Sequence, residues 1–349
     1  MTIAGVATAY PPYKYDQQTL LPALQRHWAS RIDDPAFMQR LQARVGLETR
    51  YLALPLDQYY SLNTFGQAND HWIRVGTELG QQALCHALSR AGLSTSDLGA
   101  VFFTSITGIS APSIDARLIN RMNLPRTIKR VPIVGLGCVA GAACISRAAD
   151  YVLAYPDQVA AVLSVELCSL TLQQDDTSIA NMVSSSLFGD GAAAVLLAGA
   201  ACEAWGPKVL TTRSAFYPDT EHVMGWDISE KGFRIVLSRD VPEVIFQNLA
   251  SDVDEFLAEN NLSRSDVGAW VLHTGGPRIL EATARALDLP DHALDVSWEC
   301  LRRPGNLSSA SVLAVLEEFM QKRRPDAGTY GLLAAMGPGF CAELILLQW

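Results

Sequence analysis

Positive charge is scarce in this chain, and that scarcity excludes one broad class of function. Its 27 lysine and arginine residues face 36 aspartate and glutamate residues, which leaves a formal net charge of −9 at pH 7. A protein that binds nucleic acid needs a basic surface to neutralise phosphate groups. We therefore expect no nucleic-acid partner.

Paired cysteines and long apolar runs are also missing. The cysteines form no C-x-x-C pair and no metal-site spacing, and they are scattered over positions 85, 138, 144, 168, 202, 300 and 341. This odd, dispersed set is typical of reduced thiols in a cytosol and predicts no bound metal. The start, MTIAGVATAYPPYKYD, has no basic segment followed by an apolar one, and no apolar run reaches about 18 residues. The sequence therefore predicts a cytoplasmic protein without membrane insertion.

What the chain does have is material for a large interior. It contains 349 residues, of which 49% are hydrophobic and 18% charged. That length is large for one simple core and suits two closely packed halves. In the first half, the hydrophobic pattern and turn signals predict strands and helices at Thr2–Ala9, Leu20–Ser30, Ala36–Val45, Arg50–Leu54 and Leu79–Gly92.

An internal repeat supports the two halves. The segment LSTSDLGA at 93–100 recurs as LSRSDVGA at 262–269, an offset of 169 residues. Each copy follows an amphipathic helix and precedes an apolar strand. We predict an α/β protein made of two copies of one unit, with mixed sheets between helix layers. Because Gly206-Pro207 interrupts the pattern, the predicted halves are residues 1–204 and 205–349.

The stretch VPIVGLGCVAGAACISRAAD at 131–150 carries the first chemical signal. It predicts an apolar strand at Val131–Val134, a glycine turn, and a small-residue helix from Val139, which places Cys138 at the turn. Free backbone N–H groups and the positive end of a helix favour a thiolate at such a turn. An ordinary buried cysteine is the alternative, and Cys138 alone leaves both open.

The second half supplies partners for such a cysteine. His273 ends the apolar strand Trp270–Leu272 at a turn, and crevices of α/β proteins open at strand ends. Asn306 follows the turn R-R-P-G and precedes the helix LSSASVLAVLEEF, 168 residues after Cys138. A core histidine and a helix N-cap are the ordinary alternatives. Because the repeat pairs Asn306 with Cys138, both should face one cavity, and the three residues together indicate catalysis.

Five segments resemble the type III polyketide synthases, the chalcone- and stilbene-synthase-like enzymes. They are GLGCVAGAA, SLFGDGAAAVLL, VLHTGGPRIL, RRPGNLSSASV and MGPGF, in order along nearly the whole chain. The resemblance implies the thiolase fold, with duplicated α/β/α/β/α layered halves and mixed five-stranded sheets. It implies a homodimer in which each subunit has a Cys-His-Asn site at the end of a coenzyme A tunnel. Acyl-CoA and malonyl-CoA are the implied substrates, with no other cofactor.

The resemblance also assigns roles to residues. The implied catalytic residues are Cys138, His273 and Asn306. The implied substrate-binding residues are Phe188 and Ile235 at the two gate positions, Cys168 and Thr171 in the cavity wall, Met336 in the AMGPG turn, Ala111 at the dimer crossing, and Trp226, Ser308, Arg44 and Arg50. Surface charge is the ordinary explanation of the two arginines, and contact with a coenzyme A phosphate is the alternative.

Three of these positions depart from the plant enzymes. Ile235, Met336 and Ala111 replace larger or aromatic residues, and 107–124 and 224–243 resemble bacterial synthases that make alkylpyrones and alkylresorcinols. We therefore expect a medium- or long-chain fatty acyl-CoA starter and alkylpyrone or alkylresorcinol products, although Trp226 can refill the vacated space. A 3-oxoacyl-carrier-protein synthase III-like enzyme, or a type III synthase with a small or aromatic starter, is the alternative.

The expected mechanism follows from thioester chemistry. A free cysteine thiol has a pKa near ~8.5, so a cationic His273 and the helix start should stabilise the thiolate of Cys138. After acyl transfer to Cys138, malonyl-CoA loses carbon dioxide and forms an enolate. His273 and Asn306 should donate hydrogen bonds to the enolate oxygen.

Overall fold

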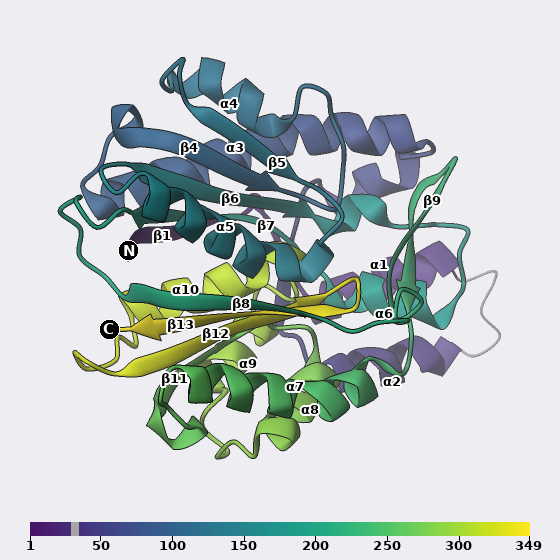
Figure 1. The fold of residues 1–349 in the computed structure, drawn as a ribbon. Coiled ribbons are helices and arrows are strands. Elements are labelled where there is room, and N and C mark those ends of the chain that lie inside the picture. The colour runs from purple at the N-terminus through teal and green to yellow at the C-terminus, as the bar shows by residue number, and fades with distance from the viewer. Residues whose placement is uncertain (29–34) are drawn as a thin grey trace.

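One mixed sheet of nine strands runs through both halves of the chain (Figure 1). The computed structural model describes residues 1–28 and 35–349. The strand order is β11-β12-β13-β8-β1-β7-β6-β4-β5, and the halves join where Thr2 of β1 pairs with Lys208 of β8. The strands are β1 (Thr2–Ala9), β4 (Leu98–Thr104), β5 (Lys129–Ile133), β6 (Val159–Leu167), β7 (Asp190–Ala198), β8 (Lys208–Phe216), β11 (Val267–Leu272), β12 (Tyr330–Gly337) and β13 (Cys341–Gln348).

The two halves repeat the same pairing pattern. In the first half, β1 pairs antiparallel with β7, β7 antiparallel with β6, and β6 parallel with β4. In the second half, β8 pairs antiparallel with β13, β13 antiparallel with β12, and β12 parallel with β11. The prediction of two five-stranded sheets is correct for the first half only. Among the described residues the second half has four strands, because the chain between α8 (Pro277–Leu287) and Asn306 forms helix α9 (Asp295–Arg302) where the first half has β5. The halves meet between Ala198 and Lys208, and the predicted boundary at 204/205 remains a prediction.

Helices form three layers around the sheet, which gives the α/β/α/β/α arrangement (Figure 1). The first layer covers β1, β7 and β6, the second lies between the halves, and the third covers the second half. In this order the helices are α3 (Phe65–Ala91) and α4 (Ile114–Met122), then α5 (Ala140–Ala154) and α10 (Ser311–Gln321), then α7 (Val241–Glu259) and α8.

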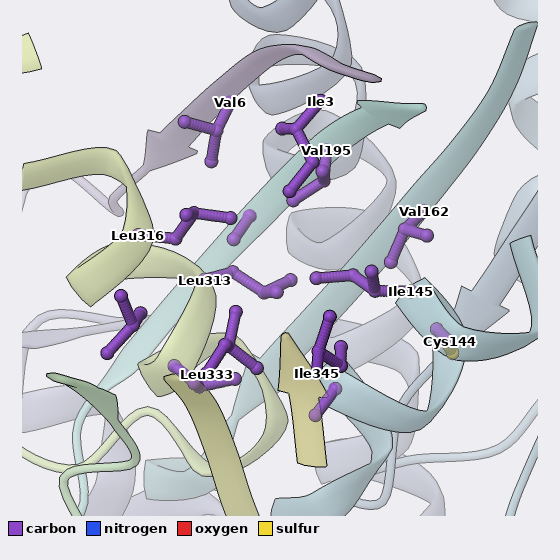
Figure 2. Packing of buried hydrophobic residues seen from close by; sticks show 14 of the residues in the cluster. Ile3, Val6, Cys144, Ile145, Val162, Val195, Leu313, Leu316, Leu333 and Ile345 are labelled. Atoms are coloured by element: carbon purple, nitrogen blue, oxygen red, sulfur yellow. The ribbon is translucent and has the colours of Figure 1, made fainter. Parts of the chain in front are cut away.

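The middle layer is the core of the molecule. Ile145 of α5 and Leu313 of α10 pack between Val162 of β6 and Ile345 of β13 (Figure 2). Small residues bring the two helices together, since a Cβ atom on Gly141 would overlap the backbone oxygen of Ser309. This close packing fixes the start of α5 against the start of α10.

One segment is more apolar than the sequence analysis recognised. Gly137–Ala154 is long and apolar enough by composition to cross a membrane, but 72% of it is buried inside the protein. A core helix in contact with apolar side chains on all sides has the same composition as a membrane span. The segment is therefore explained by its place in the middle layer.

Most local predictions agree with the structure to within a few residues. β1 and α2 (Pro35–Val45) lie as predicted, and β3 covers Thr49–Leu52. The described part of α1 is Gln17–Trp28, and the predicted end at Ser30 lies outside the described residues. Helix α3 begins at Phe65, well before the predicted Leu79, because its polar first turns lack apolar periodicity; the missed signal is the capping box of Thr64 and Gln67.

The repeat is confirmed, but one equivalence drawn from it is wrong. Ser94 and Ser263 form identical capping boxes before β4 and β11, as the offset of 169 predicts. The short helices η3 (Gly137–Val139) and η6 (Ser308–Ala310) start 171 residues apart, and both open on a positive φ, 54° and 50°. The counterpart of Cys138 is therefore Ser309. Asn306 lies two residues before η6, so its equivalent in the first half is not Cys138.

Smaller elements gather around one end of the sheet. They are β2 (Tyr13–Asp16), which pairs with β3, η1 (Leu56–Ser61), η4 (Cys168–Thr171), α6 (Ile179–Leu187), and the hairpin of β9 (Met224–Ser229) and β10 (Gly232–Leu237). β9 projects beside α6 in Figure 1. These segments enclose the cavities described next.

Candidate active site

Cys138 lies in the turn between β5 and α5, as predicted. The turn needs two glycines, because Gly135 and Gly137 have φ of 97° and 54°, and a Cβ on Gly137 would also approach Pro338 Cδ to 2.7 Å. The side chain is 7% exposed, and its Sγ lies 3.7 Å from Ser308 Oγ. The glycine turn thus brings a buried thiol to the wall of a cavity.

His273 follows directly after β11 and is held there by backbone contacts. Its N–H donates to the Ala334 carbonyl at 3.0 Å, and Ser297 Oγ fixes the strand end by donating to the Leu272 carbonyl. The imidazole is 6% exposed, and its Nδ1 is buried without a hydrogen-bond partner among the described residues. Among the residues that the structure describes, no carboxylate is bonded to this nitrogen, so the site differs from a Cys-His-Asp triad.

The orientation of the Asn306 amide is fixed by its surroundings. Oδ1 accepts hydrogen bonds from Ser308 N at 2.8 Å and Ser311 Oγ at 3.1 Å. Nδ2 donates to the Gly275 carbonyl at 3.2 Å. An amide nitrogen carries two protons, so one N–H of Asn306 remains for a ligand in the cavity.

Two chambers meet at Cys138. The outer chamber, about 510 Å³, is lined by Cys138, His273, Asn306 and Met336. The inner chamber, about 100 Å³, is lined on its far side by Leu20, Ala23 and Leu24 of α1. The residues that line both chambers are Cys138, Phe188, Met224 and Leu237.

The predicted substrate-binding residues divide between these chambers. The outer chamber contains Phe188, Met336 and Arg44. The inner chamber contains Phe188, Ile235, Cys168, Thr171, Trp226, Ser308 and Arg50. Ala111 lines neither chamber and is exposed on the surface. Met336, expected in a turn, lies in strand β12 and lines the outer chamber alone.

Arg50 has a different environment from the one expected of a phosphate ligand. It is 2% exposed, and its Nη1 donates to the carbonyls of Ser185 at 2.5 Å and Phe188 at 2.9 Å. Burial lowers the pKa of Arg50 to about 10, and Asp190 opposes this shift. The guanidinium therefore holds the end of α6 and the backbone of Phe188 in place.

Exposed arginines do surround the outer chamber. Arg44 comes from α2, Arg239 from the loop before α7, and Arg278 from the first turn of α8. Sequence reasoning missed Arg239 and Arg278, because charged residues near a turn or a helix start carry no distinctive pattern. The convergence of three elements at one mouth is visible only in the fold.

Burial shifts the pKa values of Cys138 and His273 in opposite directions. It raises the pKa of Cys138 to about 12, with the Ser308 hydrogen bond opposing and the Glu166 charge adding to the shift. Burial also lowers the pKa of His273 to about 4. Desolvation in the enclosed site thus favours the neutral form of both groups, the opposite of the thiolate and imidazolium expected from the sequence.

Glu166 is a second buried acid close to this site. Its Oε2 accepts from Ile106 N at 3.2 Å and Thr107 Oγ1 at 2.9 Å, and its Oε1 accepts from Ser309 Oγ. Burial raises its pKa. The sequence alone gives Glu166 no functional signal, because its partners come from two segments that are distant from it in the chain.

Fold and site together define a thiolase-fold condensing enzyme in which a cysteine, a histidine and an asparagine face one cavity. The chain matches the family models for the N-terminal domain of chalcone and stilbene synthases over residues 6–201 and their C-terminal domain over residues 208–349. It belongs to this family and is a type III polyketide synthase, an acyltransferase that condenses malonyl-CoA by decarboxylation. Enzymes of this family use coenzyme A thioesters and need no further cofactor.

Three known synthases are similar to this chain over nearly its whole length. The chain is 50% identical to a 1,3,6,8-tetrahydroxynaphthalene synthase of Streptomyces peucetius, covering 100% of this chain and 93% of that protein. It is 34% identical to a phloroglucinol synthase of Pseudomonas fluorescens, covering 97% of each. The crystal structure of the 1,3,6,8-tetrahydroxynaphthalene synthase of Streptomyces coelicolor superposes with a TM-score of 0.95 at 31% identity, covering 100% of this chain and 99% of that one.

Proposed function

We propose that this synthase uses malonyl-CoA both as starter and as extender, and closes the chain to 1,3,6,8-tetrahydroxynaphthalene. The observation that carries the proposal is the 50% identity, over the whole chain, to a synthase of that name. The product fits this origin, because its oxygens stand on alternate carbons, as head-to-tail two-carbon units from malonyl groups leave them.

A fatty acyl starter, with alkylpyrone or alkylresorcinol products, is the second candidate. It draws support from the apolar end of the inner chamber, where Leu20 and Leu24 line the wall. Two observations oppose it. None of the relatives reported above is named for such a product. Trp226 stands opposite Ile235 in the β9–β10 ladder and lines the same chamber, so it refills the space that an aromatic gate would occupy.

Coenzyme A binds at the mouth of the outer chamber in this proposal. Its phosphates carry negative charge, and Arg44, Arg239 and Arg278 supply the positive charge there. The pantetheine arm then runs inward between apolar side chains to Cys138. The net charge of −9 repels an anionic substrate from most of the surface. The three arginines therefore provide the local positive charge that attracts such a substrate to the site.

Starter loading uses the neutral pair of Cys138 and His273. The imidazole takes the thiol proton as the sulfur attacks the thioester carbonyl, and coenzyme A leaves as its thiol after receiving that proton back. Formation of the ion pair only during reaction suits a buried site, because no permanent charge has to be desolvated.

Extension begins when malonyl-CoA loses carbon dioxide and its electron pair forms an enolate. The free amide N–H of Asn306 and the N–H of His273 donate to the enolate oxygen, a stabilisation of about 3 kcal/mol for each donor. The enolate carbon attacks the acyl group on Cys138, the thioester bond breaks, and the sulfur leaves as thiolate. The lengthened chain is then on coenzyme A and reloads onto Cys138.

A homodimer is part of the proposal. β5 is the last strand of the sheet, and its outer edge has no partner strand among the described residues. Val134, directly after it, is 64% exposed. An open edge beside an exposed apolar residue is a surface that a second copy can cover. Sedimentation or light scattering tests this: a dimer is expected, and Val131→Pro should weaken it by interrupting the edge.

The test of the proposed function is product analysis with purified enzyme. Malonyl-CoA alone should give 1,3,6,8-tetrahydroxynaphthalene or its oxidation product. The addition of medium- or long-chain acyl-CoA should not change the main product. A series of alkylpyrones that follows the length of the added acyl chain would favour the second candidate. Cytoplasmic action is expected, because the substrates are coenzyme A thioesters.

A further inference from the structure

A buried carboxylate lies behind the wall of the inner chamber. Asp190, the first residue of β7, is 0% exposed and lines neither chamber. Its Oδ1 accepts from Ser169 N at 2.8 Å, and its Oδ2 accepts from Ala53 N at 2.6 Å and from Ser169 Oγ. The mechanism above does not use this acid.

A chain of hydroxyl groups connects Asp190 with the chamber. Ser169 Oγ lies 2.5 Å from Tyr59 Oη, and Tyr59 Oη accepts from Leu54 N at 3.2 Å. A carboxylate only accepts, so Ser169 donates to Asp190 and Tyr59 donates to Ser169. Tyr59 and Ser169 both line the inner chamber, as does Cys138. Within the part of the chain that the structure describes, these two hydroxyls connect Asp190 with the chamber.

The acidity of the groups suits proton exchange near neutral pH. Burial raises the pKa of Asp190 to about 6, and its hydrogen bonds and Arg50 limit the rise. Burial and the charge of Asp190 raise the pKa of Tyr59 well above its ordinary value. Asp190 is the group that gains or loses a proton, while Tyr59 stays a phenol and passes protons along.

We propose that Tyr59, Ser169 and Asp190 form a proton relay that catalyses carbon–carbon ring closure of the polyketide in the inner chamber. This inference rests on the proposed function, because it concerns the step that turns an extended chain into an aromatic ring. It assigns general acid–base catalysis to residues outside the Cys138, His273 and Asn306 site.

The step balances without another reactant. An enol hydroxyl of the bound chain gives its proton to Tyr59 Oη, the Tyr59 proton moves to Ser169 Oγ, and the Ser169 proton moves to Asp190. The electron pair left on the enolate forms a bond to a ketone carbon of the same chain, and the carbon–oxygen π bond of that ketone breaks. The resulting alkoxide takes a proton back through the relay, which returns to its starting state.

A purely structural role of Asp190 makes a different prediction. Its bonds to Ala53 N and Ser169 N tie β3 and η4 to β7. Tyr59→Phe and Ser169→Ala leave both of these backbone bonds in place and remove only the hydroxyl chain. Lactone closure does not need the relay, because an enol oxygen attacks a thioester directly. Loss of the relay should therefore change which ring forms.

In the experiment, malonyl-CoA is supplied to the full-length wild-type enzyme and to each variant. Coenzyme A release, carbon dioxide release and the ratio of aromatic to pyrone products are measured. In Tyr59→Phe and Ser169→Ala we expect the ratio of aromatic to pyrone products to fall roughly a hundred-fold, the lower end of acid–base contributions, and carbon dioxide release gives the total extension to which both products are normalised. Ser169→Thr should restore the ratio. Tyr15→Phe is the matched control, because Tyr15 Oη likewise accepts a backbone N–H, that of Leu56 at 3.3 Å, and lines neither chamber.

Three outcomes overturn the relay. The first is an unchanged product ratio in both variants, whether or not total turnover falls. The second is an equal fall in Tyr15→Phe. The third is a wild-type enzyme that makes only pyrones from malonyl-CoA, which rejects the proposed product as well. Wild-type aromatic product with unaffected variants rejects the relay alone.

Discussion

Ser309 occupies in the second half the position that Cys138 occupies in the first. Each is the middle residue of a short helix that opens on a positive φ and leads into the middle layer. The two have diverged in use: the thiol faces the chambers, whereas the Ser309 hydroxyl donates to Glu166 and contacts Ser164 Oγ at 2.8 Å. One copy of the repeated unit carries the proposed nucleophile, and the serine of the other copy is hydrogen-bonded to strand β6.

Replacement of the nucleophile should separate two partial reactions. Cys138→Ala should abolish acyl-enzyme formation and chain extension, because it removes the thiol that carries the acyl chain in the proposed mechanism. Some decarboxylation of malonyl-CoA should remain, since Asn306 and His273 still donate to the enolate. Mass spectrometry after iodoacetamide treatment measures the site of labelling, with Cys85→Ala, a change at an exposed cysteine, as the control. Inactivation that tracks labelling of another cysteine would contradict the assignment.

Asn306 should matter more for decarboxylation than for loading. Asn306→Ala removes the one amide N–H free for the enolate, which should lower decarboxylation by roughly a hundred-fold while single-turnover loading changes little. Ser311→Ala removes one of two donors to Oδ1 and should have a smaller effect in the same direction. Equal losses of loading and decarboxylation would show that Asn306 positions Cys138 instead.

His273 should make the protein less stable in acid. Its pKa is lowered by burial to about 4 from an unfolded value of 6.5. Between these two pKa values the unfolded state binds more protons than the folded state. The free energy of unfolding therefore rises as the pH rises through this range, and it decreases as the pH falls. From pH 7 to pH 5 the loss from this group is about 2 kcal/mol.

Urea unfolding measures that loss against a variant. In His273→Gln the decrease between pH 7 and pH 5 should be smaller by this amount, because glutamine takes up no proton and the other buried acids are unchanged. The same decrease in both proteins would show that His273 is charged in the folded state.

The resting charge of Cys138 is open to a separate test. Burial raises the pKa of its thiol, so alkylation by iodoacetamide should accelerate with pH through the alkaline range without a plateau near neutrality. Ser308→Ala removes a hydrogen bond that lowers the pKa and should slow alkylation further. A plateau at or below pH 7 would establish a resting thiolate–imidazolium pair, the arrangement expected from the sequence.

Local signals predicted what depends on local chemistry. The glycine turn placed Cys138, the apolar strand placed His273, and the repeat gave the layered halves. Counting along the repeat failed for Asn306, because the second half has two more residues than the first between the sequence repeat and the short helix that follows it. The bonds from Arg50 to the Ser185 and Phe188 carbonyls, and from Ala53 to Asp190, could not be predicted, since each joins residues more than a hundred positions apart.

The starter is the central claim, and purified enzyme with uniformly ¹³C-labelled malonyl-CoA as the sole substrate tests it most directly. Mass spectrometry should show 1,3,6,8-tetrahydroxynaphthalene, or its oxidation product, with every carbon labelled. Addition of unlabelled fatty acyl-CoA should leave that labelling unchanged. No product until a fatty acyl-CoA is added, followed by an alkylpyrone with an unlabelled side chain, would contradict the account.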